Sequence, residues 1–158
     1  DLASQIAAML QQHSLPAGSV ELELTETIAM QDPDLAVGVM QELHHQGISL
    51  ALDDFGTGYS SLSYLKQYQL QKLKIDQSFI RYLSATNDDA AIVSVTITLA
   101  QSLGMLTLAE GVETVEQRDF LRQQGCEMAQ GYLFSRPLPV DQASRYITDH
   151  EVIPYASE

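Results

Sequence analysis

Residues 20–52 read VELELTETIAMQDPDLAVGVMQELHHQGISLAL, and this stretch decides the fold class. It opens with a β-rich run, Val20–Leu24, and closes with a second one, Ile48–Leu52. Between the runs lies an apolar stripe at helical spacing, closed by Gly47 as a C-cap and formed by Leu35, Val39, Met40 and Leu43. A strand, a helix and a strand in this order predict a βαβ unit with parallel strands.

The same alternation continues along the chain. Three more β-rich runs are Leu70–Ile75, Met105–Ala109 and, as the weakest candidate, Glu127–Leu133. Helical patterns cover Asp1–Gln12, Ile92–Leu103, Val115–Gln124 and Asp141–Thr148. The second of these follows Asn87, which can cap its start, and is ended by Gly104. Five strands with intervening helices are compatible with an open doubly wound sheet and with an incomplete (β/α) barrel.

The composition narrows the class of protein. The 158 residues predict one domain, and 45% apolar with 18% charged residues is a globular composition. A formal net charge of −13 argues against a duplex nucleic acid as partner, because such binding needs a basic surface. The single cysteine, Cys126, excludes an intrachain disulfide and a cysteine-based zinc site. No apolar run is long enough to cross a bilayer, and no segment resembles a signal peptide.

Polar residues stand where each predicted strand ends. In strand order they are Glu23 and Glu26, Asp53 and Asp54, Lys74 and Asp76, Glu110 and Glu113, and Gln130. A single acid after a strand is often only the N-cap of the next helix. Four consecutive strands that end in this way favour the barrel, whose reactive groups come from the carboxyl ends of several strands.

Carboxylates without histidine or cysteine neighbours form a hard oxygen site that suits Mg²⁺ or Mn²⁺. Asp53 and Asp54 cannot both face inward from a regular strand, but at a strand end one reaches the centre while the other swings aside. This arrangement suits two ions that clamp the attacking and leaving oxygens of a phosphoryl displacement. Lys74 among these acids is either a buried counter-ion or the group that orients the attacking water.

Five motifs in this order resemble those of the EAL-domain family. They are ELTE at 23–26, LDDFGTGYSSL at 52–62, LKID at 73–76, AEGVET at 109–114 and QGYLFSRP at 130–137. The resemblance implies an α/β fold, a (β/α)₈ TIM-like barrel. It also implies an enzyme of bacterial signal transduction, a phosphodiesterase that hydrolyses cyclic-di-GMP to linear 5′-pGpG with two Mg²⁺ or Mn²⁺ ions.

Matched position by position, the resemblance assigns a role to each site residue. The four metal-binding acids are Glu23, Asp53, Asp54 and Glu110. The catalytic residues are Lys74, which stands beside the catalytic water, with Asp54 and Glu110. The supporting or substrate-binding residues are Asp76, Glu113, Gln130 and Phe134, the last of which either stacks on guanine or packs at a seam. Residues 55–61 match a mobile loop that couples metal binding to dimerisation, and Glu26 matches its anchor, through Ser60.

Two motifs of the family do not occur in this sequence. No Glu-Ala-Leu is present, and Asn87, the only asparagine, stands at the start of a mid-chain helix. We therefore expect residues 1–158 to be a partial EAL domain, the C-terminal five βα units of the barrel without its N-terminal strands. With two metal ligands missing, we expect this fragment alone to be inactive. The resemblance further implies a homodimer, an upstream sensory or GGDEF domain, and a cytoplasmic site in a parent protein that can be membrane-anchored.

Two classes of function remain open from the sequence. The first is a metal-dependent cyclic-di-GMP phosphodiesterase. The second is a non-catalytic EAL module that binds cyclic-di-GMP or a protein and regulates without hydrolysis. Every metal-binding acid of the family motif that this length of chain can contain is present, and so is the loop. This favours an active parent protein.

Overall fold

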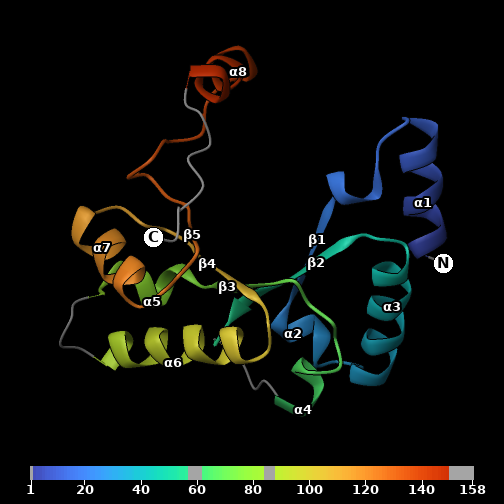
Figure 1. Cartoon of the computed structure of the whole chain (residues 1–158), viewed down its shortest axis with the longest axis horizontal. Helices are drawn as coiled ribbons and strands as arrows, with labels where there is room; N and C mark the ends of the chain where they lie inside the picture. The colour runs from blue at the N-terminus through green and yellow to red at the C-terminus, as the bar shows by residue number, and fades with distance from the viewer. Residues whose placement is uncertain (1, 57–61, 84–87, 150–158) are drawn as a thin grey trace.

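The computed structural model describes residues 2–56, 62–83 and 88–149, which contain a sheet of five parallel strands (Figure 1). The strands lie side by side in chain order. They are β1 Glu21–Thr25, β2 Ser49–Phe55, β3 Lys72–Ile75, β4 Leu106–Ala109 and β5 Met128–Ala129. Because a doubly wound sheet reverses its strand order part-way, the unbroken order is that of a barrel segment.

Strand alternation gives the sheet one apolar and one polar face. Leu50, Leu52 and Leu73 are buried on the apolar face, against which α2 (Glu26–Ala29), α3 (Pro33–His45) and α6 (Asp88–Ser102) pack. The polar face carries glutamates from β1 and lysines from β3. Leu106 of β4 shares this face with the lysines and is 48% exposed, so the face is open to solvent in the part of the chain that is described.

Capping residues explain where the longer helices begin and end. The Asp32 carboxylate accepts a hydrogen bond from the Leu35 N–H at 3.1 Å and starts α3, with Pro33 in the first turn. Gly47 follows the helix with a φ of +79°, as expected for a C-cap glycine. The other helices are α1 Leu2–Gln12, a 3₁₀ turn at Ala17–Ser19, α4 Leu62–Leu65, α5 Gln77–Arg81, α7 Val115–Gln123 and α8 Val140–Asp149.

The structure corrects several expected boundaries. Periodicity does not predict α2, α4 and α5, because four or five residues are too few to show a helical repeat. The weak fifth strand shrinks from Glu127–Leu133 to two residues. Its first residue, Glu127, instead accepts hydrogen bonds from the N–H and the hydroxyl of Thr107 through its side chain, at 2.8 and 2.5 Å. Asn87, the expected start of a helix, lies outside the described residues.

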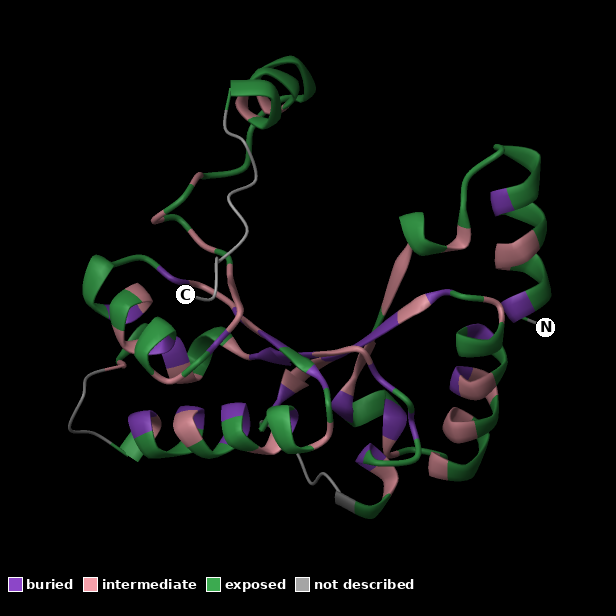
Figure 2. Ribbon diagram, in the orientation of Figure 1, coloured by how far each residue is buried: buried purple, intermediate pink, exposed green. Residues whose placement is uncertain are grey.

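Two apolar surfaces are uncovered among the described residues. In Figure 1, α8 projects away from the sheet, and Figure 2 shows it almost wholly exposed. Its Val140 and Ile147 are 85% and 69% exposed. A groove of about 380 Å³ runs along the edge strand β1 and is lined chiefly by Leu22, Leu24, Ile28, Leu35 and Val39. In the described residues, no helix combines the length and the hydropathy that a membrane span requires.

Candidate functional site

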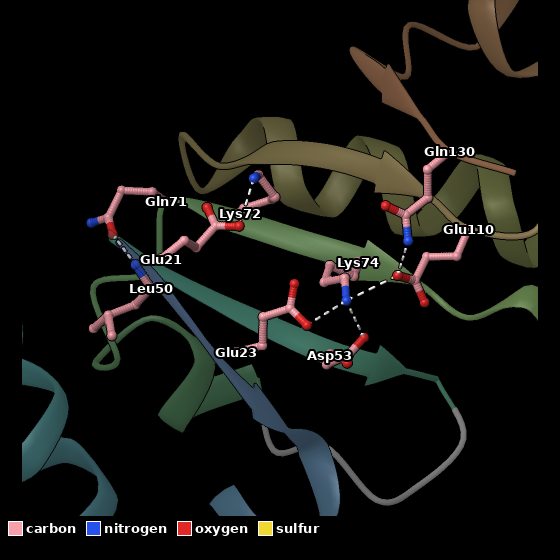
Figure 3. A network of polar contacts seen from close by, with 9 residues as sticks. All are labelled: Glu21, Glu23, Leu50, Asp53, Gln71, Lys72, Lys74, Glu110 and Gln130. Carbon is pink, nitrogen blue, oxygen red and sulfur yellow. Dashed lines mark hydrogen bonds and ion pairs between the residues drawn. The ribbon is translucent and has the colours of Figure 1, made fainter. Parts of the chain in front are cut away.

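The polar face of the sheet carries two lysine–glutamate pairs (Figure 3). Residues two apart in a strand point to the same side, so the β1 glutamates face the β3 lysines. The Nζ of Lys72 donates to Glu21 Oε1 at 2.7 Å, near the amino ends of the strands. The Nζ of Lys74 donates to Glu23 Oε2, also at 2.7 Å, nearer the carboxyl ends.

Lys74 is the centre of a larger group of acids. Its Nζ also lies 3.0 Å from Asp53 Oδ1 and 2.9 Å from Glu110 Oε1. The residue is only 4% exposed, so these carboxylates rather than water surround the ammonium. β1, β2 and β3 and the residue that follows β4 thus contribute to one cluster, as their position at the strand ends predicts.

A bulge in β2 brings both adjacent aspartates to this cluster. The pairing of β2 with β3 shifts register between Leu52 and Phe55, and Asp54 has a φ of +55°, a left-handed conformation that aspartate tolerates. The expectation that the strand ends before these residues is therefore wrong: β2 continues to Phe55, and the bulge turns the second carboxylate. One carboxylate oxygen each of Asp53, Asp54 and Glu110 lies within 4.8 Å of the other two.

Burial and the neighbouring charges shift the pKa values of three groups in the cluster. Burial raises the pKa of Glu110 against the opposing effect of Lys74. Burial, followed by the nearby carboxylates of Asp53 and Asp76, raises the pKa of Asp54. Burial alone would lower the pKa of Lys74, but its bonds to three carboxylates outweigh this, so its pKa lies above the ordinary value. A single ammonium thus faces an excess of carboxylates, which favours the binding of cations.

Gln130 and Asp76 lie beside the cluster. The Nε2 of Gln130 donates to Glu110 Oε1 at 2.7 Å, so this amide orients the acid that also contacts Lys74 (Figure 3). Asp76 Oδ1 accepts from the Ser78 N–H at 2.9 Å and caps α5. Asp76 therefore has the structural role of an N-cap in addition to its place near Asp54.

Glu113 and Phe134 lie farther from Lys74 on the loops that follow β4 and β5. Glu113 is exposed and lines a pocket of about 360 Å³ that Gln130 also lines. Phe134 is 41% exposed, and its carbonyl accepts from the Tyr146 hydroxyl at 3.2 Å. Within the described ranges, neither makes a hydrogen bond or an ion pair with the Lys74 cluster.

Glu26 lies at the start of α2 and is 1% exposed. Its Oε2 accepts a hydrogen bond from the Gly56 N–H at 3.0 Å, which ties α2 to the residue that follows β2. Ser60, the partner expected from the family resemblance, lies outside the described residues.

The sequence argument misses two polar residues, one on the same strand face as Lys74 and one behind the loop that follows β4. Lys72 precedes Lys74 by two residues, and this same-face spacing is the signal for the second lysine–glutamate pair. Gln117 is 6% exposed and bonds the loop after β4. Its signal is the Thr114-x-x-Gln117 spacing of a capping box, which the structure contains.

Comparison with known proteins decides the family. A family model described as the EAL domain matches residues 1–137, most of the chain. The chain belongs to the EAL domain family. This confirms the resemblance drawn from the five motifs, and the sheet is the corresponding part of the family's TIM-barrel fold.

The relatives of this EAL domain are named for cyclic di-GMP. It is 44% identical over 141 residues to the bifunctional diguanylate cyclase/cyclic di-GMP phosphodiesterase MucR of Pseudomonas aeruginosa, covering 89% of this chain and 21% of MucR. It is 44% identical over 146 residues to the cyclic di-GMP phosphodiesterase NbdA of the same species, covering 92% of this chain and 19% of NbdA. The chain thus spans about a fifth of these curated relatives.

Solved structures share the fold of this EAL domain. The PaMucR phosphodiesterase in complex with c-di-GMP matches with a TM-score of 0.87 and 44% identity over 90% of this chain and 63% of that one. The manganese and cy-diGMP complex of Klebsiella pneumoniae BlrP1 matches with a TM-score of 0.76 and 38% identity, over 85% of this chain and 34% of that one.

The acids of the site suit a metal ion of the kind that BlrP1 holds. The donors are carboxylate oxygens, and Asp53, Asp54 and Glu110 come close enough to share an ion. Among the described residues, neither histidine nor cysteine joins this group. A hard divalent cation is the ion that such a donor set prefers.

Proposed function

We propose that this EAL domain hydrolyses cyclic-di-GMP to linear 5′-pGpG and requires two divalent ions, Mg²⁺ or Mn²⁺. One observation carries the proposal: a buried lysine at the carboxyl ends of the strands lies within 3.0 Å of three carboxylates. An acidic site repels a phosphodiester unless cations reverse its sign, so substrate and metal belong together here. The phosphodiesterase names of MucR and NbdA support the same activity.

Four acids of this chain would hold the ions: Glu23, Asp53, Asp54 and Glu110. The bulge in β2 supports a role for two adjacent aspartates, because it turns Asp54 out of the regular alternation while Asp53 stays near Lys74. Bound ions would supply positive charge to the phosphodiester and lower the pKa of a water that attacks it.

The polar residues around the acids orient the reacting groups. Lys74 is charged and fixed by three bonds, so it holds the attacking water in line and stabilises the negative charge of the transition state. Gln130 fixes the rotamer of Glu110. Asp76 holds the turn after β3, whereas Glu113 and Phe134, on the outer rim, contact the substrate, with Phe134 against a guanine base.

The rest of a barrel completes this site. The exposed Leu106, the groove beside β1 and the apolar face of α8 are surfaces that further βα units would cover. These units would also supply the missing glutamate and asparagine ligands. We further propose that the domain is cytoplasmic and homodimeric and lies downstream of a sensory or GGDEF domain. The name of MucR as a bifunctional diguanylate cyclase and phosphodiesterase supports the last of these.

The test is hydrolysis by the full-length protein that carries these residues. Purified protein with cyclic-di-GMP and Mn²⁺ is expected to release 5′-pGpG, measured by chromatography, and chelation of the metal is expected to stop the reaction. A Lys72→Met variant is the control, because it removes a lysine from the same strand face outside the proposed site. Tight binding of cyclic-di-GMP without any 5′-pGpG would contradict the proposal and favour the regulatory module.

A further inference from the structure

Gln117 joins the loop after β4 to helix α5 through its buried side chain. Its Oε1 accepts from the N–H groups of Glu113 and Thr114, at 2.8 and 3.0 Å, in the loop after β4. Its Nε2 donates to the carbonyl of Ile80 at 2.8 Å, in the last turn of α5. The amide therefore bridges the segment that follows Glu110 and the helix that Asp76 caps.

The loop after β4 is held at nearly every backbone N–H. Glu110 donates to the Ile75 carbonyl at 3.1 Å and Val112 to the Gln130 carbonyl at 3.0 Å. The next two N–H groups donate to Gln117. Gln117 thus supplies the only side-chain acceptor among the bonds that the described residues give this loop, and it fixes the end away from the strand.

The loop after β4 and helix α5 also touch directly. Gly111 has a φ of +72°, and a Cβ atom there would lie 2.7 Å from the Cβ of Gln77 in α5. This contact shows that the loop after β4 packs closely against α5 at a position where only glycine fits. The Gln117 bridge spans this contact and, together with the bonds of the Glu110 and Val112 N–H groups, holds the loop that carries Glu110.

We propose that Gln117 is a positioning residue for the metal site, setting the loop that carries Glu110 against α5. The inference rests on the proposed function for its effect on turnover, but its effect on metal binding is independent of it. Loss of a direct partner of a metal ligand commonly costs about tenfold to a hundredfold in affinity or activity. Gln117 acts one step farther out, through the loop rather than on the ligand, so we expect the lower end of this range.

Two variants of the full-length protein separate the bridge from the helix cap. Gln117→Met keeps the length of the side chain and removes all its hydrogen bonds. Gln117→Glu keeps an acceptor for the loop, in the Thr-x-x-Glu form of a capping box, and removes only the donor to α5. The two variants are complementary. Gln117→Met adds no charge but removes the Gln117 half of the helix cap, whereas Gln117→Glu adds a charge but keeps the cap of α7.

Gln71 offers a matched control at the opposite end of the sheet. Its Oε1 accepts from the Leu50 N–H at 2.7 Å, and its Nε2 donates to the Gln69 carbonyl at 2.8 Å and lies 3.0 Å from His44 Nδ1. Gln71 and Leu50 lie near the amino ends of the strands, on the side of the Lys72–Glu21 pair away from Lys74 (Figure 3). Gln71→Met therefore removes a similar backbone bridge without touching the metal-site loops. It is expected to lower Tm by an amount comparable to that of Gln117→Met.

Mn²⁺ binding followed by electron paramagnetic resonance, together with kcat and KM for cyclic-di-GMP, tests the proposal. Both Gln117 variants are expected to weaken Mn²⁺ binding and to lower kcat by about tenfold with KM little changed, while Gln71→Met changes neither. Mn²⁺ affinity within twofold of wild type in both Gln117 variants would overturn the inference, as would an equal loss in Gln71→Met. If wild type hydrolyses no cyclic-di-GMP, the proposed function fails, and the Mn²⁺ measurement still decides the role of Gln117.

Discussion

Lys72 and Lys74 stand two residues apart on the same strand and the same face, yet their surroundings differ. Lys72 pairs with Glu21 at 2.7 Å and with no other acid among the described residues, and the two side chains are 17% and 29% exposed. Lys74, whose side chain is 6% exposed, contacts Glu23, Asp53 and Glu110. The first pair is balanced in charge, whereas the second cluster has more carboxylates than ammonium groups.

The difference between the two lysines indicates which part of the sheet forms a functional site. A balanced, partly buried pair contributes to folding and has no reason to recruit a ligand. An excess of partly buried carboxylates costs free energy unless cations join them, so such a cluster indicates a binding site. The unbalanced cluster also lies at the carboxyl ends of the strands, where barrel enzymes carry their sites.

The largest expected effect comes from testing the cluster without the rest of a barrel. Isolated residues 1–158 are expected to release no measurable 5′-pGpG with Mn²⁺, because the cluster then lacks its missing partners. Light scattering is expected to show self-association, since the outer edges of β1 and β5 are unpaired among the described residues. A monomer that turns over substrate would show that the five-strand alignment to the barrel is wrong.

Removing one carboxylate from each lysine gives the next largest effect. Asp53→Asn in the full-length protein is expected to lower kcat about a thousandfold, because a bound metal supplies several kcal/mol of transition-state stabilisation. Glu21→Gln, which removes the partner of Lys72, is the matched control and is expected to leave kcat within a few fold. Near-normal hydrolysis of cyclic-di-GMP by Asp53→Asn would refute the assignment.

Replacing each lysine by methionine probes the same contrast from the other side. Lys74→Met is expected to lower kcat about a hundredfold, as loss of an oriented electrostatic group does. Lys72→Met is expected to lower the free energy of unfolding by roughly 1 to 3 kcal/mol, between an exposed and a buried pair, and to keep kcat. Urea unfolding and steady-state kinetics measure both. An equal loss of kcat in the two variants would contradict the inference that only Lys74 takes part in catalysis.

The smallest expected effect concerns the anchor beside the cluster. Glu26→Ala is expected to lower kcat roughly tenfold and to change KM little, because the ligands remain while Gly56 loses its acceptor. Glu26→Gln keeps an oxygen for this N–H and is expected to recover most of kcat. A defect confined to KM, or a failure of the glutamine to restore kcat, would speak against anchoring.

The sequence predicts the elements better than their ends. The apolar stripe from Leu35 to Leu43 predicts α3 because a helix repeats over several turns. The sequence does not predict the short helices α2, α4 and α5, because they contain too few residues to show a helical repeat. β5 begins only at Met128, because the Thr107 N–H donates to the side chain of Glu127 rather than to its backbone carbonyl.

The site divides in the same way. Its acids follow from strand ends and motifs, but the distances among them depend on contacts between distant residues. Asp54 reaches the cluster through a bulge in β2 that no local sequence pattern predicts. Gln117 binds the Ile80 carbonyl, which belongs to another helix.

By itself, the sequence determined the alternating strands and helices, the acids at the strand ends and the family to which they belong. These features follow from periodicity and residue chemistry along the chain. Only the tertiary structure decided that Lys72 takes one carboxylate and Lys74 three, because strand register sets which side chains face each other. Register depends on the packing of the whole sheet, so the balance of charge around each lysine is a property of the fold.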